Sequence, residues 1–121
     1  MFSKNKINIY DYSDYRKFLQ EFYELEKSLD PTFSYRVFAT AVNMDASLLV
    51  KILQGKRNLT ARLVSVFADI FCNDEREKAY FADMVAFNQA KTHTESRQYL
   101  EKLVATKECK VENVAKDQFE Y

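Results

Sequence analysis

Apolar residues recur along most of the chain at intervals of three and four, the spacing that places side chains on one face of an α-helix. The pattern predicts five or six helices whose ends are marked by polar residues. The first helix is expected over about 13–29, with Asp11 and Ser13 as candidate N-terminal caps. The helix is expected to end before Asp30 and Pro31, because the residue that precedes a proline is disfavoured in a helix.

Three longer helices are expected after residue 60. Thr60, Asn73 and Thr92 are their predicted N-terminal caps, because each carries a side-chain oxygen that accepts a backbone N–H from the first turn. Thr92 is followed three residues later by a glutamate, the spacing of a capping box. The last helix is expected to end near Lys107, because the tail over 108–121 has little periodicity.

The composition narrows the fold class further. A chain of 121 residues with 47% hydrophobic and 15% aromatic residues is large and apolar enough for one domain with a core. It contains one Gly and one Pro. Sheets with many strands repeatedly need turns with Gly or Asn at positive φ, so this composition excludes most all-β and doubly wound folds. We therefore predict an all-α bundle of five to six helices.

The total charge and the cysteines favour no particular ligand. Eighteen basic and eighteen acidic residues give a formal net charge of zero. Cys72 and Cys109 lie far apart without a CxxC pair or a nearby His, which argues against a local zinc or redox motif and is typical of free thiols. No stretch has the apolar length of a signal peptide or a membrane span. We expect a cytoplasmic protein with no metal, cofactor or membrane partner.

Two short helices with a tight turn between them carry the most information. Their expected ranges, about 34–42 and 45–54, have the lengths found in a helix-turn-helix. Ala39 is small enough for the two helices to cross closely, and Asn43 is the non-glycine residue type that best tolerates positive φ in the turn. Gly55 suits the left-handed conformation that ends a helix. The spacing predicts a helix-turn-helix over about 34–54.

The segment SYRVFATAVNMDASLLVKILQGKRN, residues 34–58, resembles the helix-turn-helix of the phage-repressor and Xre type. In that pattern an Ala, a turn residue, a capping residue, a Leu-x-x-Ile pair and a closing Gly-Lys-x-Asn follow one another at these intervals. The matching residues here are Ala39, Asn43, Asp45, Leu49, Ile52 and Gly55 to Asn58. Asn43 stands where that type usually has Gly. The resemblance implies a DNA-binding module of a bacterial transcription regulator.

Further stretches are similar to the N-terminal half of the Fibrobacter-type paralogous family of bacterial proteins, whose function is not established. They cover residues 9–19, 33–36, 55–59 and 87–91. In longer members of that family a second domain follows, and its start is similar to residues 117–121. The resemblance implies a helical domain over 1–107 and a tail over 108–121 that leads into a C-terminal domain absent from this chain.

The distribution of charge supports DNA binding without any resemblance. Residues 34–62 contain five basic residues and one acidic residue, a local charge of +4, whereas the segments before and after carry a small excess of acidic residues. Duplex DNA attracts a basic patch by releasing counterions, and a short helix fits its major groove. The partner predicted from this distribution is double-stranded DNA, with the helix over 45–54 in the major groove.

The candidate contacts divide into two sets. The residues expected to face base edges are Ala46, Ser47, Val50, Lys51 and Gln54. The residues expected to contact phosphates are Ser34, Tyr35, Arg36, Lys56, Arg57, Asn58 and Arg62. Because Ala46 and Ser47 are small, we expect weak selectivity for sequence.

Other interpretations stay open at this point. Basic residues are also typical of a solvated surface, and a helix-turn-helix scaffold also serves as a protein-interaction or dimerisation module without DNA. Apolar residues of the last helix suit pairing across a two-fold axis, which would give a homodimer. They are Tyr99, Leu100, Leu103 and Val104. His93, the only histidine, has no spacing that suggests catalysis, so we expect neither an enzyme nor a small-molecule substrate.

Overall fold

The computed structural model describes residues 7–119 of the chain and the side chains of residues 7–107. Within this part the backbone forms one 3₁₀-helix, six α-helices and no strand. They are η1 (Ile9–Asp11), α1 (Tyr15–Leu29), α2 (Tyr35–Ala41), α3 (Ala46–Leu53), α4 (Ala61–Phe71), α5 (Glu75–Asn88) and α6 (His93–Phe119). The all-α fold predicted from the sequence is confirmed.

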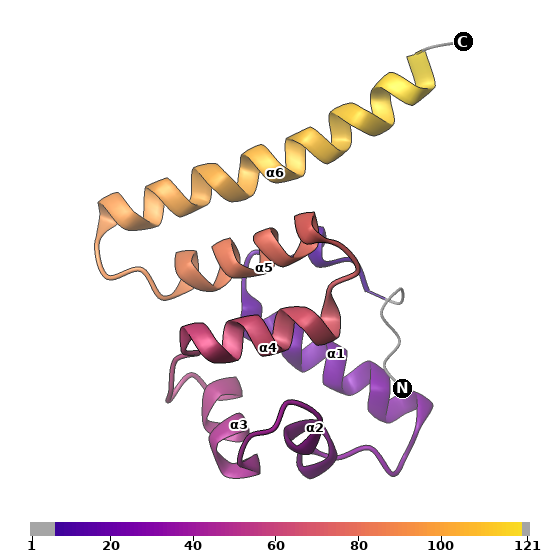
Figure 1. Cartoon of the computed structure of the whole chain (residues 1–121), viewed down its shortest axis with the longest axis vertical. Coiled ribbons are helices and arrows are strands. Elements are labelled where there is room, and N and C mark those ends of the chain that lie inside the picture. Colours follow the sequence, from indigo (N-terminus) through magenta and orange to yellow (C-terminus); the bar gives the residue numbers. More distant parts are fainter. Residues whose placement is uncertain (1–6, 120–121) are drawn as a thin grey trace.

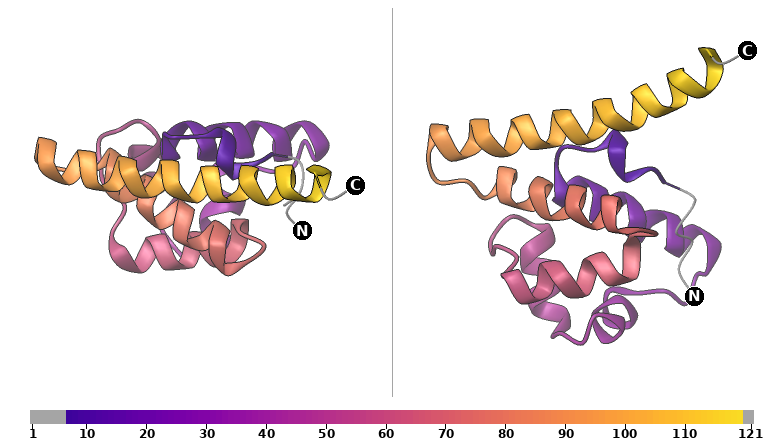
Figure 2. Two further views of the ribbon diagram at one scale, coloured as in Figure 1. Left: turned by 90° about the horizontal axis from the view of Figure 1, so that it is seen from above. Right: turned by 45° about the horizontal axis from the view of Figure 1, so that its top comes forward.

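The helices are arranged in layers from one end of the molecule to the other (Figure 1). α6 lies along α5 at one end, α2 and α3 lie together at the other end, and α1 and α4 lie between them (Figures 1 and 2). α1 contacts both α3 and α5, so it joins the two ends. Within residues 7–119, no helix combines the length and the apolar character that crossing a membrane requires.

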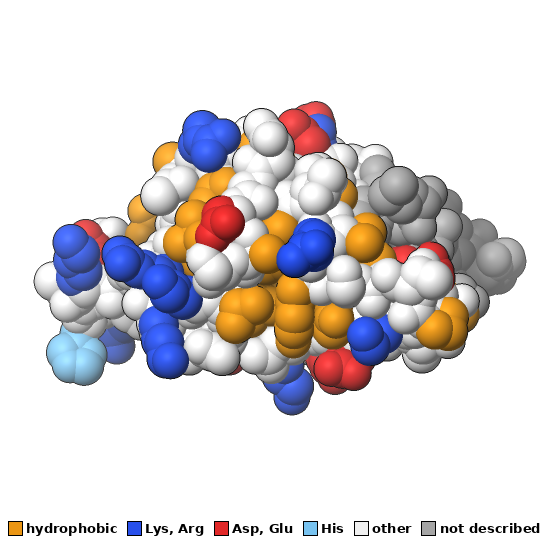
Figure 3. Space-filling model, turned by 90° about the horizontal axis from the view of Figure 1, so that it is seen from below, with side chains coloured by type: hydrophobic (Ala, Val, Ile, Leu, Met, Phe, Trp, Pro, Cys, Tyr) orange, Lys and Arg blue, Asp and Glu red, His pale blue; other side chains and the backbone are white. Residues whose placement is uncertain are grey.

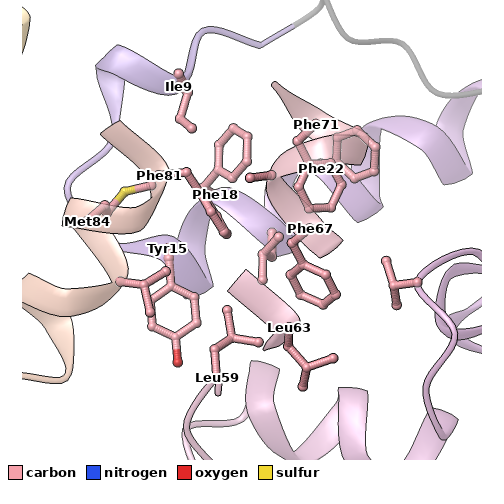
Figure 4. Packing of buried hydrophobic residues seen from close by; sticks show 14 of the residues in the cluster. Ile9, Tyr15, Phe18, Phe22, Leu59, Leu63, Phe67, Phe71, Phe81 and Met84 are labelled. Carbon is pink, nitrogen blue, oxygen red and sulfur yellow. The ribbon is translucent and has the colours of Figure 1, made fainter. Parts of the chain in front are cut away.

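One cluster of buried side chains, drawn from all of the helices, holds these layers together. Phenylalanines form its centre: the ring of Phe22 lies 4.5 Å from that of Phe71, and Phe67 packs 5.7 Å from Phe71 (Figure 4). Phe38 inserts from α2 and contacts the ring of Phe71 at 5.8 Å. Edge-to-face ring pairs contribute about 1 kcal/mol each beyond the burial of their area. The seven-residue α2 is therefore anchored in the core that α1 and α4 share.

The predicted cap of α1 is wrong. Asp14, rather than Asp11 or Ser13, precedes the helix, and its carboxylate accepts the N–H of Arg16 at 2.9 Å. Asp11 lies in η1 instead. The carbonyl groups of Tyr12 and Ser13 accept hydrogen bonds from side chains of α5, which hold this stretch outside the helix. A tertiary contact therefore decides where α1 begins.

The predicted cap of α5 is displaced by one residue. The carboxylate of Asp74 accepts the N–H of Glu77 at 2.8 Å, and the N–H of Asn73 donates to the side chain of Glu77 at 3.0 Å. Asn73 and Asp74 are both good capping residues, and a cap must directly precede the first helical residue. Thr60 and Thr92 cap α4 and α6 as predicted.

The last helix differs most from the prediction. α6 continues to Phe119, so the end expected near Lys107 lies inside one helix. Leu103 is only 3% exposed and belongs to the core, whereas Leu100 and Val104 are 43% and 45% exposed. The use of Leu103 at a surface between two copies is therefore wrong, because Leu103 is covered within its own chain. Of the predicted tail, residues 120–121 lie outside the described residues.

Candidate nucleic-acid interface

The chain turns sharply between α2 and α3. Asn43 has a φ of 54°, the left-handed conformation predicted for it. The N–H of Met44 donates to the carbonyl of Ala39 at 2.9 Å, and the N–H of Asn43 donates to the carbonyl of Thr40 at 3.1 Å. This pair of bonds is a Schellman motif, which satisfies carbonyls left open at a helix end. The predicted break between two short helices is confirmed at Asn43.

α3 ends in the same way. Gly55 has a φ of 83°, and its N–H donates to the carbonyl of Ile52 at 3.1 Å. The N–H of Lys56 donates to the carbonyl of Lys51 at 2.9 Å, which completes a second Schellman motif. Glycine adopts this φ without strain because it has no Cβ. The predicted end of α3 is confirmed, and the following loop leaves the helix in a defined direction.

The starts of the two short helices use side-chain oxygens. The hydroxyl of Ser34 accepts the N–H of Val37 at 3.3 Å and caps α2. Asp45 stands at the predicted capping position of α3, but its carboxylate accepts a hydrogen bond from the Ser47 hydroxyl rather than from a backbone N–H. That hydroxyl holds the pKa of Asp45 below its usual range. The hydroxyl proton of Ser47, a predicted base contact, is therefore already directed at Asp45.

An arginine from α1 holds the end of α3 and the loop after it. The Nε of Arg16 donates to the carbonyl of Ile52 at 2.8 Å. One terminal nitrogen of Arg16 donates to the carbonyl of Arg57 and to the Oδ1 of Asn58, each at 3.1 Å. Charged donors make stronger hydrogen bonds than neutral donors do. Arg16 therefore ties residues on both sides of Gly55 to α1.

Gln20 adds a second contact one turn further along α1. Its side-chain amide donates to the carbonyl of Leu53 at 2.9 Å. Sequence reasoning assigned no role to Arg16 or Gln20, because their partners are backbone carbonyls, which leave no trace in a sequence. The only available signal was the spacing of four, which places two long hydrogen-bond donors on one face of a helix.

The far end of the loop is held by α5. The hydroxyl of Tyr15 donates to the Oε1 of Gln89 at 2.7 Å, and the N–H of Leu59 donates to the same oxygen at 2.7 Å. The amide of Gln89 donates back to the carbonyl of Leu59 at 3.0 Å. Figure 4 shows the hydroxyl end of Tyr15 next to Leu59. Burial raises the pKa of Tyr15, so its hydroxyl stays protonated as a donor.

The predicted base-facing residues are not equally accessible. Ser47 and Lys51 on α3 are exposed, and so is Gln54, the residue that directly follows α3. Ala46 and Val50 are half-buried, and Ala46 packs against the core. The side chains that α3 presents most fully are therefore polar or charged, and Ala46 serves the core as well as the surface.

Most of the predicted phosphate contacts are exposed. The exposed members are Tyr35, Arg36, Lys56, Arg57, Asn58 and Arg62. Three predicted contacts have other partners. Ser34 is half-buried and caps α2, the ring of Tyr35 stacks on that of Tyr23 at 4.1 Å, and the Oδ1 of Asn58 accepts the bond from Arg16. The basic members of the set are the ones whose charged groups remain available.

The basic side chains of residues 34–62 make no salt bridge with any described residue, whereas Lys78 on α5 pairs with Asp69 at 3.2 Å and with Glu75 at 3.5 Å. Figure 3 views the molecule from the end formed by α2 and α3. Lys and Arg side chains gather on the left of this face, and hydrophobic side chains lie in its middle. The face can therefore offer cations to an anionic partner and an apolar strip beside them.

Among the described residues, no group of three or more His, Cys, Asp or Glu side chains is placed to hold a metal ion. His93 is exposed at the start of α6, Cys72 is buried in the core, and the side chain of Cys109 lies outside the described residues.

We compared the chain with protein-family models, with curated proteins and with solved structures, and none of the three comparisons gave a match.

Proposed function

We propose that α2, the turn at Asn43 and α3 form a helix-turn-helix that binds duplex DNA in a bacterial transcription regulator. One observation carries this proposal: the basic side chains on and around α3 are exposed and make no salt bridge with the described residues. They are Arg36, Lys51, Lys56, Arg57 and Arg62. DNA phosphates bind such an array by releasing condensed counterions.

α3 would lie in the major groove. A helix with its side chains is about 10–12 Å in diameter, which fits a groove about 12 Å wide, and the eight residues of α3 would extend about 12 Å along it. Lys51 would donate to the O6 and N7 of a guanine, and Gln54 would pair with the edge of an adenine. Val50 is half-buried and could reach a thymine methyl with its exposed part. With two long polar side chains on α3, the proposed selectivity is modest.

The remaining basic residues would hold the phosphate backbone. Lys56 and Arg57 lie in the loop that Arg16 ties down, and Arg62 lies in the first turn of α4. Contacts to phosphate fix the register of a protein on the duplex but carry no sequence information. These residues would therefore supply affinity, and α3 would supply selectivity.

We propose a homodimer as the binding form, because one short helix covers few base pairs and a dimer aligns two of them about 34 Å apart. The surface that suits a second copy is the exposed part of α6 with Leu100 and Val104. These two side chains line a cleft with Tyr12 and Tyr80, next to the buried Leu103. Leu100 and Val104 are large apolar side chains exposed to solvent, and covering such side chains favours association with another protein chain.

Binding to labelled random-sequence duplex DNA, measured by fluorescence anisotropy between about 50 and 200 mM salt, tests the proposal. The logarithm of the affinity should fall linearly with the logarithm of salt concentration, with a slope of about −4 if the four basic side chains other than Lys51 each contact a phosphate. Absence of binding at low salt, or a slope near zero, would contradict the proposal.

A second candidate function is that of a protein-interaction module without DNA. A groove of about 610 Å³ runs between α4 and α5 and is lined mainly by small apolar side chains. They include Val64, Ala68, Ala79, Ala82 and Val85. On α2, Tyr35 and Val37 are 37% and 40% exposed. A chain with only this second function would not bind duplex DNA even at low salt, so the same titration separates the two functions.

A further inference from the structure

Arg16 differs from the other basic side chains at this end of the molecule, because its donors point inward. It is half-buried and makes hydrogen bonds to the carbonyls of Ile52 and Arg57 and to the Oδ1 of Asn58. Its guanidinium carbon lies 4.7 Å from the centroid of the Tyr15 ring. Three hydrogen bonds and a cation–π contact hold this side chain in one conformation.

These contacts are part of a set of side-chain hydrogen bonds that holds both ends of the loop between α3 and α4. Gln20 holds the carbonyl of Leu53 at the start of the loop, and Gln89 holds both backbone groups of Leu59 at its end. The Oε1 of Gln89 also accepts a hydrogen bond from the hydroxyl of Tyr15, and Arg16 makes its cation–π contact with the ring of the same tyrosine. The loop is therefore fastened to α1 and α5, although its own side chains are mostly exposed.

We propose that Arg16 is a positioning residue for DNA binding. It holds the end of α3 and the loop with Lys56 and Arg57 in the arrangement that meets the duplex, and it does not contact DNA itself. The last carbonyls of a helix form the negative end of its dipole and need donors. Because Arg16 supplies those donors in the free protein, less ordering is left for the binding step. The inference rests on the proposed function.

The variant Arg16→Met tests this role, with Arg62→Met as the matched control. Arg62 is exposed and makes no salt bridge with the described residues, so its loss should lower the salt slope by about one. Arg16→Met should lower the affinity about tenfold and leave the salt slope unchanged. Fewer molecules would hold the loop in the conformation that binds DNA, and this lowers the affinity by the same factor at every salt concentration. Arg16→Lys keeps one charged donor and should recover part of the affinity.

A second measurement does not depend on DNA. Amide hydrogen exchange in the free protein reports on the N–H groups of Gly55, Lys56 and Leu59, all of which are hydrogen-bonded in the loop. In Arg16→Met these amides should exchange about tenfold faster through local opening. Amides of the α4 and α5 core, such as those of Phe67 and Val85, should keep their rates.

Three results would overturn the positioning role. The first is wild-type affinity in Arg16→Met. The second is a slope lowered by about one, which would make Arg16 a phosphate contact. The third is faster exchange in all helices, which would mean that Arg16 acts through global stability. If the wild-type chain binds no duplex DNA, the proposed function fails and exchange alone decides: faster exchange confined to the loop supports ordering by Arg16, and unchanged exchange overturns it.

Discussion

The α2–α3 pair and the α5–α6 pair lie at opposite ends of the molecule and use their polar residues in opposite ways (Figure 1). In the α2–α3 pair, backbone groups at the helix ends are bonded within the pair or to α1, and the basic side chains stay exposed. In the α5–α6 pair, Asn88 and Gln89 are bonded to the backbone of other elements, and Lys78 is in an ion pair.

The two ends of the molecule therefore differ in role: the polar side chains of one stabilise the fold, and the exposed basic side chains of the other are available to bind a partner. The polar side chains at the end of α5 fasten the start of α1 and the loop before α4, so their replacement should act on folding. The basic side chains of the α2–α3 end make no salt bridge with the described residues, so their replacement should act on binding.

The largest effect is expected at the buried face of α6. Leu103→Asp removes a core side chain that is 3% exposed and places a carboxylate there, so it should lower the free energy of unfolding by at least about 4 kcal/mol. Leu100→Asp, on the exposed face, should change the free energy of unfolding of the monomer by less than about 0.5 kcal/mol, so the unfolding is measured at a concentration below that of dimer formation. Urea unfolding followed by circular dichroism measures both.

Sedimentation of the same two variants tests the proposed dimer. Leu100→Asp should stay folded and shift the chain from dimer to monomer at concentrations of tens of micromolar. A wild-type chain that is monomeric both free and on DNA would contradict the dimer. A folded Leu103→Asp of wild-type stability would contradict the burial of Leu103.

The second prediction concerns the basic end. The triple variant Lys51→Ala, Lys56→Ala, Arg57→Ala should weaken DNA binding by about 1 kcal/mol per residue at about 0.1 M salt. It should reduce the slope by about two, because Lys56 and Arg57 are proposed to contact phosphates and Lys51 a base. Its free energy of unfolding should stay close to that of the wild type, because none of the three side chains forms a salt bridge with the described residues. Lys78→Ala is the control, since Lys78 on α5 already pairs with Asp69 on α4. Equal losses in both proteins would contradict the assignment.

The third prediction compares the two turns that bound α3. Gly55→Ala should cost about 1–2 kcal/mol of stability, because a residue with a Cβ is strained at a φ of 83°. A new Cβ would meet only the Nε of Arg16, at 3.9 Å, so crowding adds little. Asn43→Gly should be close to neutral, since Gly adopts a φ of 54° without strain. Thermal unfolding distinguishes the pair, and a neutral Gly55→Ala would count against a rigid end of α3.

The smallest effect is expected from pH. The Ser47 hydroxyl holds the pKa of Asp45 low, so Asp45 contributes stability that is present above the unfolded pKa of about 3.9 and is lost as pH falls. Burial on α5 raises the pKa of Asp83, so its contribution is present at low pH and is lost as pH rises. Unfolding of the wild type, Asp45→Asn and Asp83→Asn between about pH 2.5 and 6 should show differences of opposite sign. Differences of equal sign would contradict one of the two assignments.

The amino-acid sequence alone predicts which segments are helical and where the two turns around α3 lie, although not where α1 begins or α6 ends. Each of these features depends on contacts within a few residues: Asn43 and Gly55 close Schellman motifs whose bonds span five or fewer positions, and Ser34 caps a helix three residues away. Such contacts follow from residue type and spacing alone. The break at Asn43, the end at Gly55 and the caps at Thr60 and Thr92 were therefore predictable.

Packing in the tertiary structure sets which of the apolar residues on one side of α6 are buried. Leu100, Leu103 and Val104 are neighbours on one side of α6, so their spacing does not tell which of them faces α5 and the core. Packing buries Leu103 and leaves the other two exposed. The same holds for Ala46 and Val50 on α3, which were predicted to face DNA and are half-buried.

The tertiary structure also decided how the candidate site is held. Arg16 reaches Ile52 across 36 positions, and Tyr15 reaches Gln89 across 74 positions. The carbonyl that Arg16 contacts is one of many, because every residue has a backbone carbonyl, and Gln89 is one of several amide side chains in the sequence. Only packing of α1 against α3 and α5 selects among them, because hydrogen bonds of this kind form where the chain brings donor and acceptor within about 3 Å.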